Sequence, residues 1–136
     1  MPPLQMREVP AERRQLFEDL TITALEGGSN YWYFLPDLSM VTKHKDIKEP
    51  LSIKIFRAAF DRGESVPVHD KEDGGMMGEF NEKSNLGYFN RDNIDKAWQL
   101  MQDKYPRHFG DLFNDWDSTT ADVWFQLAVM GEVVYG

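Results

Sequence analysis

Residues 26–34 read EGGSNYWYF, and this stretch joins the end of a helix pattern to the start of a strand pattern. The preceding residues predict a helix over positions 10–26, because apolar side chains recur there at helical spacing. Its apolar face is formed by Leu16, Phe17, Leu20 and Ala24. Gly27 stands where helices often end in a left-handed residue, and YWYFL is rich in strand formers. The stretch therefore predicts helix, glycine and strand in succession.

The same order recurs in two other segments. LSIKIFRAAFDRG, residues 51–63, has a helical apolar pattern ending at Gly63, and SVPVHD follows as a strand. Pro67 restricts that strand to an edge or a strand start, because proline donates no ladder hydrogen bond. DSTTADVWFQLAVMGEVVYG, residues 117–136, predicts a capped helix that ends at Gly131, with EVVY as a final strand.

The remaining segments supply further short strands and one more helical region. DLSMV is expected to continue the first strand, and MMGEF and LGYFN are strand candidates around the turn NEKSN, preceded by an Asp73–Gly74 turn. A helix begins near residue 91, capped by Asn90 or Asp92, and Pro106 separates it from a short piece, HFGDLF. Together these patterns predict one α+β domain over residues 1–136, with a small, largely antiparallel sheet and three or four helices.

Composition narrows the classes of function. The formal net charge of −8 disfavours direct nucleic-acid binding, which needs clustered Lys and Arg, although it is compatible with a protein that imitates nucleic acid. Cysteine is absent, which excludes disulfides and thiolate metal sites. No apolar run has the length of a membrane span, and the first residues do not form a signal peptide. A cytoplasmic protein without a membrane partner is expected.

No arrangement of residues predicts a catalytic or metal site. The three histidines, His44, His69 and His108, have no spacing that places two imidazoles on one helical face. His69 stands beside Asp70, but neighbouring side chains of a strand point to opposite faces. The glycines form neither a dinucleotide-binding fingerprint nor a phosphate-binding loop. The sequence therefore predicts no catalytic residue, metal ligand or cofactor, and a small hydrolase using His69 or His108 with a carboxylate stays the last alternative.

Aromatic and amide residues beside turns are the main candidates for binding. In a strand, Tyr31 and Tyr33 face one side while Trp32 and Phe34 face the other, so one pair enters the core and the other is available to stack on a base, a sugar or a protein. A site between subunits is expected for so short a chain, which predicts a homo-oligomer. The predicted ligand-binding residues are Asn30, Tyr31, Trp32, Tyr33, Phe80, Asn90, Arg107 and Gln126.

Two polar residues interrupt the apolar pattern of the last helix. Asp122 and Gln126 are four positions apart, so they share one helical face. Asp122 is expected in the first turn, where the helix dipole favours an anion. A buried Gln needs hydrogen-bond partners, and Gln126 is expected to find them at a strand end, on a ligand or on a neighbouring subunit.

The segment EGGSNYWY together with the later pattern D-x-T-x-A-D-V-x-x-Q-x-A-x-x-GEVVYG resembles a group of small proteins encoded by tailed phages and prophages. The matching positions at one end are residues 26–33. Those at the other end are Asp117, Thr119, residues 121–123, Gln126, Ala128 and residues 131–136. VPVHDKED and LGYFNRDNI match more loosely. The resemblance implies a phage origin and carries over no catalytic residue.

A phage origin suggests an accessory role for an acidic, cysteine-free domain of this size. Accessory phage proteins include anti-defence proteins, some of which, such as the Thoeris anti-defence sponges, sequester nucleotide-derived immune signals. By this analogy the chain is expected to be a non-catalytic binding protein in the host cytoplasm that sequesters a small nucleotide-like ligand. The alternative is an inhibitor or scaffold that contacts a host defence protein, including by nucleic-acid mimicry.

Overall fold

The α+β architecture is confirmed by the computed structural model of the chain, which describes residues 9–43, 48–71 and 85–136. Several sequence-based expectations lie outside these described residues. They concern the MMGEF strand, the Asp73–Gly74 turn, His44 and the predicted ligand-binding residue Phe80. The other expected elements are compared with the observed ones below.

Helices make up most of the described chain. In chain order they are α1 (Ala11–Thr23), α2 (Ser39–Thr42), α3 (Leu51–Phe56), α4 (Arg91–Lys104), α5 (Pro106–Asp111) and α6 (Ser118–Met130). α1 and α3 continue into the π-helical turns η2 (Ala24–Gly28) and η3 (Arg57–Asp61). Side-chain caps begin the two longest helices of the second half. Asn90 accepts from the Asn93 amide at 2.9 Å, and Asp117 accepts from the Thr120 amide at 3.1 Å.

The sheet has three antiparallel strands in the order β1-β2-β3, namely β1 (Tyr33–Phe34), β2 (Val66–Asp70) and β3 (Asn85–Phe89). β2 is the central strand, although it contains Pro67. β1 pairs only with Asp70 and His69, so β2 has a strand neighbour on just one side at Pro67. The expectation that Pro67 places its strand at a sheet edge is therefore met only locally. β2 is central in the sheet, but at Pro67 one of its sides has no strand neighbour that would need a proline N–H.

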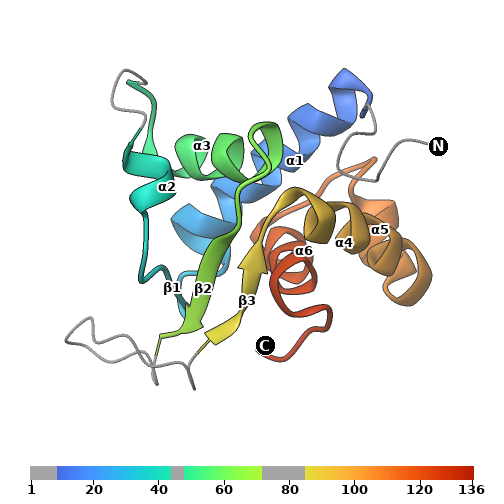
Figure 1. Ribbon diagram of the computed structural model, residues 1–136. Coiled ribbons are helices and arrows are strands. Elements are labelled where there is room, and N and C mark those ends of the chain that lie inside the picture. The colour runs from blue at the N-terminus through green and yellow to red at the C-terminus, as the bar shows by residue number, and fades with distance from the viewer. Residues whose placement is uncertain (1–8, 44–47, 72–84) are drawn as a thin grey trace.

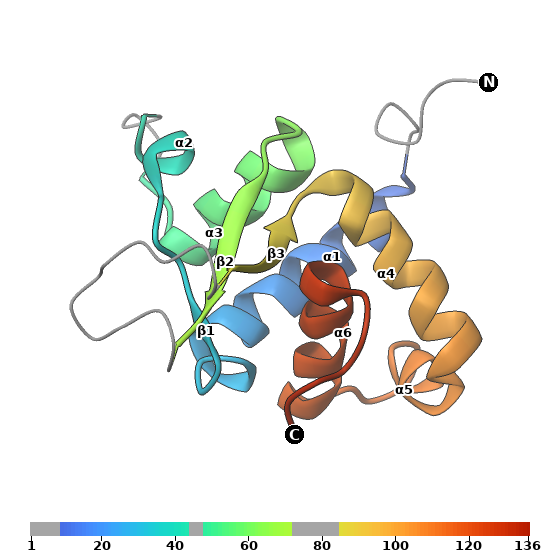
Figure 2. The same ribbon diagram turned by 60° about the horizontal axis from the view of Figure 1, so that its bottom comes forward.

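α6 lies at the centre of the structure, where it contacts α1, α4, β3 and η2 (Figure 1). In both views α2 and α3 lie on one side of α1 and α6, and α4 and α5 lie on the other (Figure 2). Every residue of α6 from Thr120 to Val129 is buried, as expected for a helix that is largely apolar around its circumference. Trp124 is among the largest fully buried side chains. Within the described ranges, no helix is long and apolar enough to cross a membrane.

The predicted glycine stops are correct at two helix ends and wrong at the third. Gly63 and Gly131 adopt left-handed φ values of 67° and 77°. Gly27 instead lies inside η2, and the Ser29 amide donates to the Ala24 carbonyl at 2.8 Å to close this wide turn. A Cβ on Gly28 would lie 2.6 Å from the Ser118 carbonyl oxygen. The glycine pair therefore serves close packing of η2 against the start of α6 and does not form a left-handed helix stop.

Three strand predictions are wrong or too long. YWYFL contributes only the two residues of β1, because residues 30–32 form a turn. The SMV part of DLSMV lies in α2, and the Asp37 carboxylate before the helix accepts from the Ser39 amide at 2.9 Å. EVVY is not a strand, and a side chain of α6 satisfies part of its backbone hydrogen bonding, as described next. A local side-chain hydrogen bond favours the helix at DLSMV, a backbone hydrogen bond from Trp32 to Ser29 closes the turn before β1, and Gln126 binds the backbone of EVVY.

Candidate functional site

The SNYW segment and α6 meet around the carboxylate of Asp122, whose residue is 8% exposed. Its Oδ1 accepts from the Ser29 hydroxyl at 2.7 Å and from the Trp32 indole N–H at 2.8 Å. Its Oδ2 accepts from the Tyr31 hydroxyl at 2.6 Å and from Gln126 Nε2 at 3.2 Å. Four donors from two distant segments therefore satisfy one buried anion without a cation among them.

Asp122 was expected in the first turn of its helix, and this placement is wrong. The N-cap is Asp117, so Asp122 lies beyond the first turn, where no acidic residue is found. Side-chain hydrogen bonds therefore satisfy its charge more directly than the helix dipole does. The pKa of Tyr31 is raised to about 12. The larger cause is desolvation of its hydroxyl, and the second is the hydrogen bond to the Asp122 carboxylate. Tyr31 consequently remains a protonated donor at neutral pH.

Gln126 extends this network to the last residues of the chain. Its Oε1 accepts from the amides of Val134 at 2.8 Å and Tyr135 at 2.9 Å, and its Nε2 donates to the Tyr135 carbonyl at 3.0 Å. The Tyr135 ring stacks on Trp32 with centroids 5.3 Å apart, and its hydroxyl donates to the Asp70 carboxylate. The hydrogen-bond partners expected for a buried Gln126 are thus backbone groups of the chain's own final segment.

We call this network the Asp122 clasp. Its members are Ser29, Tyr31, Trp32, Asp122, Gln126 and Tyr135. The clasp joins EGGSNYWY to DxTxADVxxQxAxxGEVVYG, two segments that lie more than half the chain apart. Both segments therefore have a structural reason for their unusual residues, since each polar or aromatic group in the clasp finds its partner in the other segment or in the chain's end.

The first four predicted ligand-binding residues do not form an alternating strand surface, because Tyr31 and Trp32 belong to the turn before β1. Trp32 is 2% exposed and packs within the core, whereas Tyr31 is 49% exposed with its hydroxyl bound to Asp122. The half-buried Tyr33 donates to the Leu25 carbonyl at 2.6 Å. The backbone carbonyl of the exposed Asn30 accepts from Lys71 Nζ at 3.0 Å.

The other predicted ligand-binding residues are distributed over the fold. Gln126 is a member of the clasp. Asn90 caps α4 and also donates to the Ser65 hydroxyl at 3.0 Å, while Arg107 is exposed on α5. The structure therefore brings Tyr31, Trp32 and Gln126 together, and Asn90 and Arg107 are not members of that cluster.

The histidines of the described chain lie in different elements. His69 is buried in β2, and desolvation lowers the pKa of its imidazole. The adjacent Asp70 carboxylate binds the Tyr135 hydroxyl, and His108 lies on α5. Across residues 9–43, 48–71 and 85–136, no group of three His, Cys, Asp or Glu residues is placed to hold a metal ion. The hydrolase alternative remains a prediction.

A hollow of about 470 Å³ lies between the start of α1, α4 and the segment after α5. Its lining residues are Pro10, Glu12, Arg13, Leu16, Trp98, Leu112 and Phe113. The Arg13 guanidinium carbon lies 4.6 Å from the centroid of the Trp98 ring. Phe113 is 67% exposed, and its ring is 6.1 Å from that of Trp98. This Trp98 hollow combines a cation, which covers the half-buried Trp98 ring, with the exposed ring of Phe113.

Sequence reasoning missed the Trp98 hollow for a physical reason. The spacing of Ile94, Ala97, Trp98 and Met101 indicates a helix face that packs inward, and the ring of Trp98 is indeed half-buried. Arg13 belongs to another helix, and no pattern in the sequence predicts that its guanidinium covers this ring. The only local signal is Phe113, an apolar residue beside the polar run NDWD.

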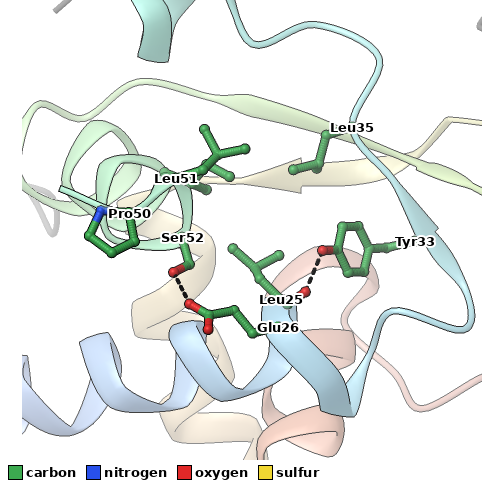
Figure 3. A pocket seen from close by; sticks show the side chains of 8 residues that line it. Leu25, Glu26, Tyr33, Leu35, Pro50, Leu51 and Ser52 are labelled. Atoms are coloured by element: carbon green, nitrogen blue, oxygen red, sulfur yellow. Dashed lines mark hydrogen bonds between the residues drawn. The ribbon is translucent and has the colours of Figure 1, made fainter. Parts of the chain in front are cut away.

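A second hollow, of about 350 Å³, lies between η2, β1 and α3 (Figure 3). Its lining residues are Leu25, Glu26, Tyr33, Leu35, Pro50, Leu51, Ser52 and Ile55. Of the predicted ligand-binding residues, Tyr33 lines this Tyr33 hollow. The volumes of both hollows lie at the lower end of the range for ligand sites in proteins, which starts at about 300 Å³.

Comparison of the chain with protein families, with curated proteins and with solved structures finds no match. The two hollows and the Asp122 clasp are therefore defined by the geometry of this chain alone.

Proposed function

We propose that this chain is a non-catalytic binding protein that sequesters a small nucleotide-like ligand in the Trp98 hollow. The observation that carries this proposal is the position of the Arg13 guanidinium, 4.6 Å from the centroid of Trp98 and in the same hollow as the exposed Phe113. Aromatic faces stack on bases, and an arginine beside them supplies a charge-assisted partner for phosphate.

Each part of such a ligand has a matching group in the hollow. A base stacks on the Phe113 ring or on the outer face of the Arg13 guanidinium, since planar guanidinium groups also stack on bases. The guanidinium edge binds phosphate oxygens through its fixed array of N–H donors. The Glu12 carboxylate at the same hollow accepts hydrogen bonds from an exocyclic amino group.

The Asp122 clasp is a poorer candidate for this ligand. The indole N–H of Trp32 and the amide of Gln126 already have partners within the chain. A ligand that bound these groups would have to break buried hydrogen bonds, which leaves their partners unsatisfied at a cost of about 1–3 kcal/mol each. The exposed Phe113 ring of the Trp98 hollow is available without this cost.

The biological setting proposed for this binding rests on the resemblance to tailed-phage and prophage proteins. In that setting the chain is a phage-encoded accessory protein in the host cytoplasm, and the ligand is a nucleotide-derived immune signal. We extend the proposal to a homo-oligomer, because the Trp98 hollow is open and a second copy of the chain would enclose the ligand.

A second candidate function is contact with a host defence protein at the same surface. The exposure of Phe113, 67%, favours it, because exposed aromatic residues often anchor protein interfaces. The net charge of −8 also allows mimicry of nucleic acid toward a basic partner. This function requires no nucleotide, so binding of a nucleotide at Arg13 separates the two candidates.

The test is calorimetric titration of the purified chain with adenosine monophosphate and with ADP-ribose. We expect saturable binding that Arg13→Gln weakens by about 10-fold or more, because a charge-assisted hydrogen bond is lost. Arg107→Gln is the matched control, since Arg107 also carries a positive charge but does not line the hollow. The proposal would be overturned if the chain bound neither of the two nucleotides. It would also be overturned if the wild type and Arg13→Gln bound them equally well.

A further inference from the structure

The Tyr33 hollow has a lining of a different chemical character from that of the Trp98 hollow. Apolar side chains from η2, β1 and α3 form most of its surface, and Figure 3 shows Leu25, Leu35 and Leu51 around it. Ser52 and Ile55 are buried, whereas Glu26 and Leu51 are exposed at the rim. The hollow is therefore an apolar depression with a carboxylate at its edge.

The hydroxyl protons of this hollow are already used within the chain. The Tyr33 hydroxyl donates to the Leu25 carbonyl at 2.6 Å, and the Ser52 hydroxyl donates to the Glu26 carboxylate (Figure 3). A hydroxyl that donates its single proton retains only acceptor capacity, and an ionised carboxylate is an acceptor alone. The side-chain polar groups that line the hollow therefore offer acceptors to a ligand and no donors.

The charge of the lining has the same consequence. The lining contains one carboxylate, that of Glu26, and none of the eight lining residues is Lys or Arg. The pKa of Tyr33 is raised, mainly by burial and to a smaller extent by the negative charge of Glu26. The Tyr33 hydroxyl therefore keeps its proton. A phosphate or carboxylate would meet repulsion and find no donor here, whereas a ligand with N–H donors and a positive charge would be complementary.

We propose that the Tyr33 hollow is a binding site for a small amine, a ligand with an apolar body and one protonated nitrogen. The apolar body lies against Leu25, Leu35 and Ile55, and the nitrogen donates to the Glu26 carboxylate. The Tyr33 ring at the same hollow adds attraction for the cation through its π face. This site is separate from the proposed nucleotide site, because the two hollows share no lining residue and favour ligands of opposite charge.

Phenethylamine is a suitable probe, with 2-phenylethanol and 3-phenylpropionate as neutral and anionic counterparts of similar shape. The amide resonances of Ser52 and Ile55 are followed by NMR during titration of the full chain with each compound. We expect saturable shifts with the amine, weaker binding of the alcohol and no binding of the carboxylate. Equal binding of amine and carboxylate, or no saturable shift with the amine up to its solubility limit, would overturn the proposal.

Two variants test the role of the carboxylate without disturbing the core. Glu26→Gln keeps an acceptor for Ser52 but removes the charge, and we expect it to weaken phenethylamine binding by about 10-fold. Leu51→Lys places a cation at the exposed rim, and we expect it to abolish that binding. Glu12→Gln removes the same charge from the Trp98 hollow and should leave amine affinity unchanged. Wild-type affinity in Glu26→Gln would contradict the assignment.

Discussion

The Asp122 clasp and the Trp98 hollow are built from similar residues, yet they differ in where their partners lie. In the clasp, Trp32, Gln126 and the Asp122 carboxylate bind one another or the chain's last residues. In the hollow, Arg13 lies on Trp98 and makes no ion pair within the described residues, and Phe113 faces solvent. An aromatic and polar cluster in a sequence thus indicates a binding surface only when the chain does not itself satisfy it.

Removal of the carboxylate at the centre of the clasp should have the largest effect. Asp122→Ala leaves the donors of Ser29, Trp32 and Gln126 without their shared acceptor. We expect the free energy of unfolding to fall by about 3 kcal/mol or more, because each unsatisfied buried donor costs about 1–3 kcal/mol. Urea denaturation followed by tryptophan fluorescence measures this change.

Asp115→Ala is the matched control for that substitution, because it removes an exposed carboxylate. Its stability should stay within about 0.5 kcal/mol of the wild type. If Asp122→Ala were no more destabilising than Asp115→Ala, the clasp would not be a structural element, and its residues would again be candidates for ligand binding.

The two glycines of the opening motif should respond differently to the addition of a methyl group. A Cβ on Gly28 would lie 2.6 Å from the Ser118 carbonyl oxygen, whereas a Cβ on Gly27 has nothing within 4 Å. We expect Gly28→Ala to lower the free energy of unfolding by about 1–3 kcal/mol, as overpacking does. Gly27→Ala should be neutral or slightly stabilising. Equal midpoints of urea denaturation for the two variants would contradict the close packing of η2 on α6.

Truncation of the exposed ring of the Trp98 hollow should separate binding from stability. Phe113→Ala should weaken nucleotide binding by about 5- to 10-fold, since stacking is worth about 1–3 kcal/mol per base and the guanidinium supplies part of it. Its stability should change by less than about 0.5–1 kcal/mol, because Phe113 is 67% exposed. Leu51→Ala, at the other hollow, should leave nucleotide affinity unchanged. A nucleotide affinity unaffected by Phe113→Ala would exclude stacking on this ring.

The smallest effect is expected from the ionisation of Tyr31 at high pH. The pKa of Tyr31 is raised from 10.0 to about 12, first by desolvation and then by its bond to Asp122. A raised pKa in the folded state means that the stabilising contribution is complete below about pH 10 and is lost as pH rises through about 12. The difference in unfolding free energy between the wild type and Tyr31→Phe should therefore shrink over this range. A constant difference would show that the Tyr31–Asp122 bond is not formed.

The sequence predicts much of the fold, because local patterns determine it. Apolar spacing predicts α1, α3, α4 and α6, and the caps Asn90 and Asp117 are observed. The strand predicted from EVVY is wrong because Gln126 of α6 binds that backbone, a contact that no local pattern specifies. The prediction that Gly27 ends the helix in a left-handed conformation is wrong for a similar reason. The glycine that the fold requires is the neighbouring Gly28, because a Cβ there would meet Ser118, a residue far along the chain.

The candidate sites are less predictable than the fold. Alternation along YWYF assumes a strand, and the turn at residues 30–32 removes that assumption. Whether a ring is buried, as Trp32 is, or covered by a cation, as Trp98 is, depends on tertiary contacts. Tyr33 is the predicted ligand-binding residue that lines one of the two hollows. Glu26 lines the same hollow and belongs to the EGG end of the opening motif, where the sequence pattern predicts only a helix end.

The central claim is that a nucleotide binds at the Trp98 hollow while the Asp122 clasp stays intact. The most direct measurement is NMR of the four tryptophan indole N–H resonances during titration with adenosine monophosphate. We predict a saturable shift of the Trp98 resonance and no shift of the Trp32 resonance, whose N–H is bound to Asp122. A saturable shift of Trp32 with Trp98 unmoved would contradict this account and assign the ligand to the SNYW segment.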